Sequence, residues 1–295
     1  MKNISQPSIR SLRIQLPPLP QQRKIARILT TLDNVITQTE ALIAKYQAIK
    51  QGLMHDLFTR GVDATGKLRP PQSEAPELYK QSELGWIPKE WEVSELGDFL
   101  TSIDAGWSPE CIEVPPSAGE WGVLKVSAVT SGKFVAAESK TLPKHLQPDL
   151  SIEVKVGDVL LARSNGVAEL VGVTVQVLDV PDKLMLSDKV LRLNPKKERL
   201  TNEFLASTMK TEGIRKQVGQ VISGSSGQRN VSQVQIRTFR FVAPPVDEQR
   251  RISARIDAIQ MQCNHETNAC GGLRELKTGL MQDLLTGKVR VNAEV

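Results

Sequence analysis

Two short polar loops carry the side chains of this chain best suited to recognising another molecule. The first is Arg163-Ser-Asn-Gly166, which follows the apolar run Val159–Ala162, and the second is Ser223–Asn230, which contains Gln228 and Arg229. Arginine, asparagine, glutamine and serine side chains make hydrogen bonds with base edges and phosphates in nucleic acids. The same residue types also fill ordinary solvated turns, and residue type alone favours that interpretation.

Other combinations of residues that could support catalysis or metal binding are weak. Asp149, Glu153 and Lys155 spell a nuclease-like pattern, but the carboxylates of a nuclease must converge on Mg²⁺ from separate elements. The segment Cys263–Cys270 holds two cysteines and one histidine at a spacing that does not match the usual zinc sites. The chain has no Gly-x-Gly-x-x-Gly, Walker-type or Gly-x-Ser-x-Gly motif. We therefore expect neither a catalytic centre nor a metal site.

The composition is that of a soluble globular protein. Hydrophobic residues make up 40% and charged residues 24%, and the net charge of +5 permits nucleic-acid binding without requiring it. The apolar runs are too short to span a bilayer, and no charged-then-apolar signal segment follows Met1. Three cysteines are a sparse and odd set, so we expect reduced thiols and a cytoplasmic protein.

The two ends of the chain repeat one another. Residues 3–62 align with residues 230–289 without a gap, and 19 of the 60 positions are identical. The identities cluster at the two ends of the alignment, around Pro17-Pro18 and Pro244-Pro245 and again after Lys50 and Lys277. A unique middle segment is therefore held between two similar arms.

Each arm is predicted to begin as a short strand and to continue as a long helix. Apolar and basic residues alternate in Ile9–Ile14 and Ile236–Phe241, which is typical of a half-buried strand, and the proline pairs then stop it. In residues 21–58 the apolar residues alternate in spacings of three and four, which predicts a coiled coil with the second arm. In that second arm Gly271-Gly272 would cost about 2 kcal/mol relative to alanine, so we expect a kink or fraying there.

The middle segment is predicted to be one α+β domain. Residues 59–83 are rich in turn-forming and polar residues and are expected to form a linker. Several apolar runs then predict strands, and a single helix is expected over Asn202–Val218. The strand-like runs are Gly122–Val129, Val154–Ala162, Leu170–Leu178 and Met185–Leu193. Strands with few helices favour a mixed α+β class, with one domain of ordinary size and two long helices from the repeated arms.

Several short motifs together carry a resemblance to a known family. They are Leu16-Pro-Pro-Leu-Pro-Gln-Gln-Arg-Lys-Ile25, Ala243-Pro-Pro-Val-Asp-Glu-Gln-Arg-Arg-Ile252, Gly52–Leu57, Gly279–Leu284, Leu84–Trp91, Gly157–Gly166 and Leu170–Gly172. In combination they make the chain resemble the specificity subunit of type I restriction–modification systems over nearly its whole length.

This resemblance implies a DNA-recognition role and a set of partners. Two recognition domains would each read half of a split DNA site, while two antiparallel helices act as a ruler and dock two modification subunits that methylate adenine. A restriction subunit would add ATP-driven translocation and cleavage. The chain itself would hold no cofactor, because S-adenosylmethionine, ATP and Mg²⁺ belong to the partner subunits.

The resemblance also assigns candidate DNA-binding residues. By position in the family pattern they are Lys125, Arg163, Ser164, Asn165, Gln228 and Arg229. Arg163 or Arg229 would bind guanine in bidentate fashion, and Asn165 or Gln228 would bind adenine.

The chain departs from the family pattern because it has one complete recognition domain. The expected division is a tail of a missing first domain (1–16), a first repeat helix (17–58), the linker (59–83), the recognition domain (84–245), a second repeat helix (246–285) and a tail (286–295). Two copies could pair with two-fold symmetry and rebuild the two-domain ruler, which would demand a palindromic, interrupted site. The alternatives are an inert truncated fragment, a coiled-coil assembly protein without a DNA role, and a nuclease using Asp149, Glu153 and Lys155.

Overall fold

The computed structural model describes residues 5–11, 16–224 and 228–292, and the chain divides into two compact units. The arm unit comprises Met1–Leu53 and Ile256–Val295, and the central unit comprises Met54–Arg255. Among the described residues, no helix is both long enough and apolar enough to cross a bilayer.

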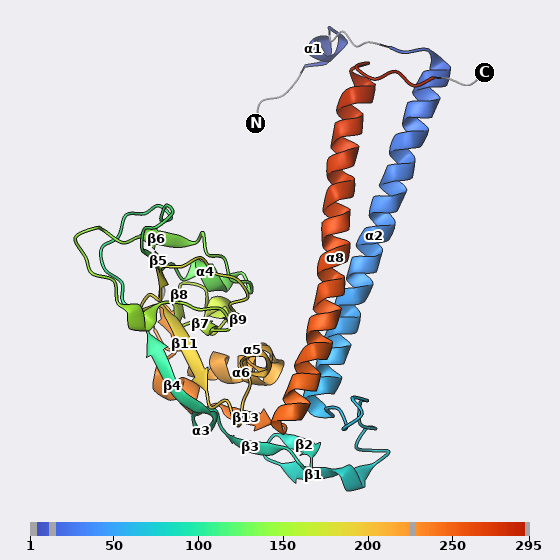
Figure 1. Ribbon diagram of the computed structural model, residues 1–295. Helices are drawn as coiled ribbons and strands as arrows, with labels where there is room; N and C mark the ends of the chain where they lie inside the picture. Colours follow the sequence, from blue (N-terminus) through green and yellow to red (C-terminus); the bar gives the residue numbers. More distant parts are fainter. Residues whose placement is uncertain (1–4, 12–15, 225–227, 293–295) are drawn as a thin grey trace. The chain divides into compact units, whose positions relative to one another are not determined.

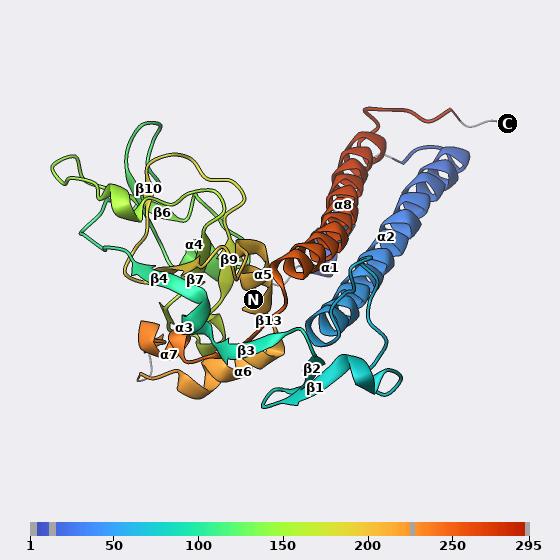
Figure 2. The same ribbon diagram turned by 60° about the horizontal axis from the view of Figure 1, so that its bottom comes forward.

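The arm unit is built from two long helices, α2 (Leu19–Thr59) and α8 (Val246–Leu285). The C-terminal end of α2 and the N-terminal end of α8 belong to the central unit. Figures 1 and 2 show them side by side within this unit, running in opposite directions. Buried residues along α8 are separated by multiples of seven positions, at Ile256, Cys263, Cys270 and Leu284. This spacing is the seam of a coiled coil, and the predicted antiparallel helix pair is confirmed.

Polar contacts across the seam repeat with the internal symmetry of the sequence. Lys277 Nζ lies 2.5 Å from Asp33 Oδ1, and Lys50 Nζ donates a hydrogen bond to Gln260 Oε1. Lys50 aligns with Lys277 in the repeat, and Asp33 aligns with Gln260. The two contacts are therefore equivalent under a pseudo-two-fold axis that relates the helices, which is expected when two copies of one sequence pack antiparallel.

The expected kink at Gly271-Gly272 is wrong, because α8 continues without interruption through both glycines. The two glycines are exposed, and a Cβ atom added to either would meet nothing within 4 Å. On the opposite face Cys263 and Cys270 are buried in the seam. Packing of that face offsets the low helix propensity of glycine, since most helical stability in proteins comes from tertiary contacts.

The predicted strands at the start of each arm are wrong in their first residues. The structure has short helices there instead, α1 (Gln6–Arg10) and α7 (Gln233–Arg237), and residues 12–15 lie outside the described part of the chain. Ser232 accepts a hydrogen bond from Gln235 N, and the Gln235 side chain accepts one from Ser232 N, which forms a capping box. Ser5, at the position equivalent to Ser232, likewise caps α1 through Ser8 N. Only the later part of the second prediction is a strand, β13 (Arg240–Ala243).

The central unit holds a four-stranded antiparallel sheet in the order β4-β11-β7-β9. These strands are β4 (Leu100–Ala105), β11 (Val190–Pro195), β7 (Val159–Ala162) and β9 (Thr174–Gln176). A three-stranded sheet has the order β10-β5-β6, with β10 (Leu184–Met185), β5 (Gly122–Leu124) and β6 (Ser139–Thr141). Strand pairs join β1 (Tyr79–Ser82) to β2 (Gly85–Pro88), β3 (Glu92–Glu95) to β13, and β8 (Ser164–Asn165) to β12 (Arg229–Asn230).

The helices of the central unit are short. Besides α7, they are α3 (Leu96–Phe99), α4 (Ser127–Thr130), α5 (Asn202–Thr208) and α6 (Glu212–Val221), with 3₁₀ turns η1 (Pro76–Leu78), η2 (Leu150–Ile152) and η3 (Ala168–Leu170). The single helix expected over Asn202–Val218 is therefore two helices. Thr211 is extended, with ψ 151°, and starts α6 as its N-terminal cap. Its hydroxyl donates to Thr208 O at 2.7 Å, which fixes the break.

The residues expected to form a linker carry defined structure. Residues 59–83 include η1 and β1, and Tyr79 is buried with its hydroxyl donating to Pro70 O at 2.6 Å. Three aromatic rings meet further inside the central unit: Phe204 lies 5.5 Å from Phe58 and 6.4 Å from Phe241, measured between ring centroids. The end of α2 is thus part of the hydrophobic core of this unit.

Candidate nucleic-acid interface

One edge of the four-stranded sheet gathers the polar loops that the sequence singles out. Neighbouring strands are antiparallel, so the end of β4, the start of β11 and the end of β7 lie at the same edge. Residues 106–108, 187–189 and 163–166 leave the sheet at this edge. We call this set, together with β12, the recognition edge.

The two loops singled out in the sequence meet at the recognition edge. Asn165 and Ser164 of β8 pair with Arg229 and Asn230 of β12, and Val231 N donates to Arg163 O at 3.0 Å. Residues 225–227 lie outside the described part of the chain. The pairing brings Arg163, Asn165 and Arg229 together, although they come from loops well separated in the sequence.

The side chains of this group differ in how accessible they are. Gln228 and Arg229 are exposed and Arg163 is half-buried, and none has a side-chain partner among the described residues. Asn165 Oδ1 accepts a hydrogen bond from Val167 N at 2.9 Å, which leaves its amide NH₂ group to donate elsewhere. Ser164 is only 6% exposed.

Lys125 lies apart from this group. It follows β5 of the three-stranded sheet, where its backbone N donates to Glu138 O at 2.9 Å. Its ammonium group is 4.0 Å from Glu113, whose pKa is held below its usual range by a hydrogen bond from Lys140. The strand pairing that joins Arg163 to Arg229 does not include Lys125.

The residues of the nuclease-like pattern have separate local roles. Asp149 Oδ1 accepts hydrogen bonds from the backbone N and hydroxyl of Ser151, which cap η2. These bonds lower the pKa of Asp149. Glu153 instead pairs with Lys155 and accepts a hydrogen bond from Lys183 N at 3.0 Å. In the described parts of the chain no group of three or more histidine, cysteine, aspartate or glutamate side chains is placed to hold a metal ion.

A buried arginine braces the sheet near the recognition edge. Arg192 of β11 donates to Asp104 Oδ2 of β4 at 2.8 Å and to Ser151 O at 2.8 Å, and it lies 3.3 Å from Asp158 Oδ2. Burial disfavours the charged form of Asp104, but hydrogen bonds from Arg192, Asn194 and Ser102 outweigh it and lower its pKa. The network ties β4 to β11 and so fixes the two strands that carry the edge.

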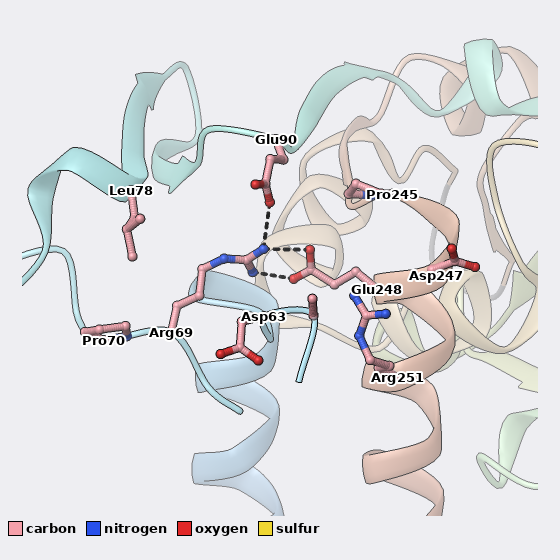
Figure 3. Close-up of a pocket in the computed structure, with 10 residues that line it drawn as sticks. Asp63, Arg69, Pro70, Leu78, Glu90, Pro245, Asp247, Glu248 and Arg251 are labelled. Atoms are coloured by element: carbon pink, nitrogen blue, oxygen red, sulfur yellow. Dashed lines mark hydrogen bonds and ion pairs between the residues drawn. The ribbon is translucent and has the colours of Figure 1, made fainter. Parts of the chain in front are cut away.

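A second polar cluster, which the sequence did not indicate, joins residues 59–69 to the start of α8. Glu248 is buried, and its two carboxylate oxygens lie 2.5 and 2.9 Å from the guanidinium group of Arg69, as Figure 3 shows. Glu248 Oε1 also accepts a hydrogen bond from Val62 N at 2.9 Å. Burial disfavours the charge of Arg69, yet Glu248 and the exposed Glu90 outweigh this and raise its pKa.

The space around this cluster is a cavity of about 530 Å³ lined on one side by Asp63 and Pro70 and on the other by Pro245, Asp247 and Arg251. Gly61 has a φ of +64°, and a Cβ atom there would lie 2.1 Å from Glu248 Oε1. The close approach requires glycine at this turn. Its residues come from two segments far apart in the chain, so no local pattern in the sequence marks the cluster.

Comparisons with known proteins agree on one family. The sequence profile of the type I restriction modification DNA specificity domain matches residues 1–51 and 88–269. The MjaVIII specificity subunit of Methanocaldococcus jannaschii is 27% identical over 291 residues, which are 95% of this chain and 63% of that protein. The EcoEI specificity subunit of Escherichia coli is 30% identical over 197 residues, 66% of this chain and 32% of that protein.

Solved structures show the same fold. The S subunit of a type I restriction–modification system from M. genitalium superposes with a TM-score of 0.55 at 13% identity, covering 91% of this chain and 61% of that chain. The HsdS subunit from Thermoanaerobacter tengcongensis gives a TM-score of 0.50 at 18% identity, covering 98% and 64%. The chain thus spans less than two thirds of the length of these relatives.

Proposed function

We propose, from the premise that this chain belongs to the family of type I restriction–modification DNA specificity domains, that its central unit reads one half of a split DNA site. The observation that carries this proposal is the recognition edge, where Arg163, Asn165 and Arg229 present unused donors side by side. Arginine suits guanine and asparagine suits adenine in the major groove. Ser164 is buried, so it would position the loop rather than contact a base.

The chain would direct catalysis by other subunits rather than perform it. Modification subunits would supply S-adenosylmethionine and methylate adenine, and a restriction subunit would supply ATP-driven cleavage with Mg²⁺. We assign the recognition domain to residues 84–245 and the docking ruler to α2 and α8, with residues 59–83 joining them. Lys125 remains a candidate phosphate contact on a different sheet.

The test is to co-express the chain with modification subunits and map methylated adenines across the host genome. A sequence-specific motif is expected, and Arg163→Ala should lower discrimination at one base pair by about 1–3 kcal/mol. Lys80→Ala, which removes an exposed charge from β1, is the matched control and should leave the motif unchanged. Sequence-independent binding or no methylation with soluble partners would favour a coiled-coil assembly protein or an inert fragment.

We also propose that two copies of the chain pair to complete the ruler. The support comes from the internal repeat of residues 3–62 and 230–289. Some positions that are equivalent in the repeat are buried in one arm and exposed to solvent in the other. Val62 is fully buried in the central unit, whereas its equivalent in the arm unit, Val289, is 48% exposed. Ala243 is 5% exposed, and its equivalent Leu16 is 74% exposed.

Polar groups show the same contrast. Gln249 is buried, and its side chain binds Thr201 N, Arg199 O and Pro244 O. Its equivalent Gln22 reproduces the local bond to Pro17 O at 2.7 Å but is only half-buried, and among the described residues its side chain makes no second hydrogen bond. The start of α2 and the end of α8 therefore carry an apolar surface suited to a recognition domain like the one in this chain.

Self-pairing predicts a palindromic, interrupted methylation motif, because protein two-fold symmetry is mirrored in the site. An asymmetric split motif would instead mean that another specificity chain supplies the second domain. Sedimentation of the chain alone and with modification subunits gives an independent measurement. Finding one copy of the chain in both cases would refute self-pairing while leaving the DNA-reading proposal intact.

A further inference from the structure

The recognition edge contains two exposed side chains that the sequence motifs did not indicate, Trp107 and Lys189. Trp107 follows β4 and is 40% exposed, and Lys189, which precedes β11, is also exposed. Among the described residues neither side chain has a hydrogen-bond or ion-pair partner.

Backbone hydrogen bonds place these residues in the same row as Arg163. Trp107 N donates to Leu186 O at 3.3 Å, Gly106 N donates to Ser187 O at 3.2 Å, and Arg163 N donates to Lys189 O at 2.8 Å. The segments therefore lie in the order 106–108, 187–189, 163–166 and β12 along the edge. An aromatic side chain lies at one end of this row, and cationic side chains follow it.

The loop that carries Trp107 is held in place by its own contacts. A Cβ atom on Gly106 would lie 2.1 Å from Leu186 O, so only glycine allows this close approach of the two segments. The Ser108 hydroxyl donates a hydrogen bond to Asp188 Oδ1, and Asp188 N donates one to Ser108 Oγ at 3.3 Å. Trp107 is thus exposed on an anchored loop.

The charges along the row suit a polyanion. Among the described residues the side chains of Arg163, Lys189 and Arg229 have no ion-pair partner. The acids in or beside these segments include Asp188, which accepts a hydrogen bond from the Ser108 hydroxyl, and the exposed Glu110 and Glu169. A free lysine is suited to a phosphate, and an exposed aromatic ring is suited to an apolar base contact, such as a thymine methyl group or the face of an unstacked base.

We propose that Trp107 and Lys189 extend the DNA-reading edge, with Trp107 contributing to sequence choice and Lys189 binding a backbone phosphate. This inference rests on the proposed function and adds two residues with different roles to it. The two roles predict different effects. Loss of a phosphate contact weakens binding to all DNA sequences alike, whereas loss of a base contact changes the base preference at one position.

The test uses the full chain purified with its modification subunits and a pool of duplexes with randomised sequence, selected by binding and sequenced. Trp107→Ala should lower preference at one base-pair position about tenfold, and Trp107→Phe should restore most of it. Lys189→Ala should keep the preferred sequence but weaken binding to every duplex. It should also reduce the slope of log affinity against log salt concentration by about one.

Two matched controls lie on the β1–β2 hairpin, which belongs to a different sheet of the same unit (Figure 1). Trp86 is an exposed tryptophan and Lys80 an exposed lysine, so Trp86→Ala and Lys80→Ala should change neither preference nor salt slope. Circular dichroism of each variant checks that the fold is retained.

The outcomes separate this inference from the function beneath it. If Arg163→Ala alters the selected sequence while both edge variants match the parent, the inference is overturned and the proposed function stands. If the parent complex selects no sequence, the proposed function fails and this inference fails with it.

Discussion

The buried ion pair between Glu248 and Arg69 offers a sharp test of how residues 59–69 are held to the start of α8. Glu248 is 2% exposed, and both of its oxygens are committed to Arg69, with one also accepting from Val62 N. Removing one partner of a buried pair costs about 3–5 kcal/mol, because the other charge is left in a poorly solvated site. Arg69 keeps its contacts with Glu90 and with Arg60 O, so we expect Glu248→Ala to cost about 3 kcal/mol, the lower end of that range.

Urea unfolding monitored by tryptophan fluorescence measures this change. Trp91 is buried beside the cluster, since a Cβ atom on Gly61 would lie 2.4 Å from its Cζ2 atom. The transition midpoint should fall while the slope of the unfolding free energy against urea stays the same. A loss below about 1 kcal/mol would refute the argument that the pair is both buried and necessary.

Three further variants separate charge from packing. Glu248→Gln preserves an acceptor for Val62 N and should cost about 1–2 kcal/mol. The double variant Arg69→Met with Glu248→Leu removes both charges and should recover most of the stability, because no unpaired buried charge remains. Glu90→Ala removes an exposed partner and should change stability by less than about 1 kcal/mol.

The other predictions concern the arm helix, the sheet network and the arm entrance. Alanine at both positions of Gly271–Gly272 should stabilise the helix pair by about 1–2 kcal/mol, measured by thermal unfolding in far-UV circular dichroism; a decrease would show hidden packing at these sites. Asp104→Asn should destabilise the protein at neutral pH, and the difference should vanish as pH falls. The pKa of Asp104 is lower in the folded protein than its ordinary 3.8, so the stabilisation from its ion pair with Arg192 is full above that value. It is lost as pH falls through the lower folded value, and a difference that persisted in acid would contradict this. Gln249→Ala should cost about 2–3 kcal/mol in urea unfolding because it leaves three backbone groups without their partner, one of them buried and two part-buried, whereas Gln22→Ala should cost less than half as much; equal losses would contradict the contrast between the two ends.

Local signals in the sequence were enough to define the arms. The repeat, the proline pairs and the three-and-four spacing of apolar residues predict two helices with matching apolar stripes, and the family resemblance adds that they run antiparallel. The capping box at Ser232 and Gln235 was also written in the sequence, as a serine followed three residues later by glutamine. The same segment alternates apolar and basic residues, a pattern that also fits a strand.

Tertiary structure decided the features that depend on residues far apart in the chain. Strand propensity identified the apolar run before Arg163, but only the pairing of β8 with β12 brings Arg163 and Arg229 together. Such pairing depends on packing against neighbouring strands, which no local pattern records. The sequence likewise indicated a weak point at Gly271, and the buried face of the same helix overrode it. The sequence by itself therefore determined the periodic helices and the residue types of the loops. Tertiary contacts decided which loops meet. The physical reason is that a local period in the sequence specifies which face of an element is buried but not which other segment packs against that face.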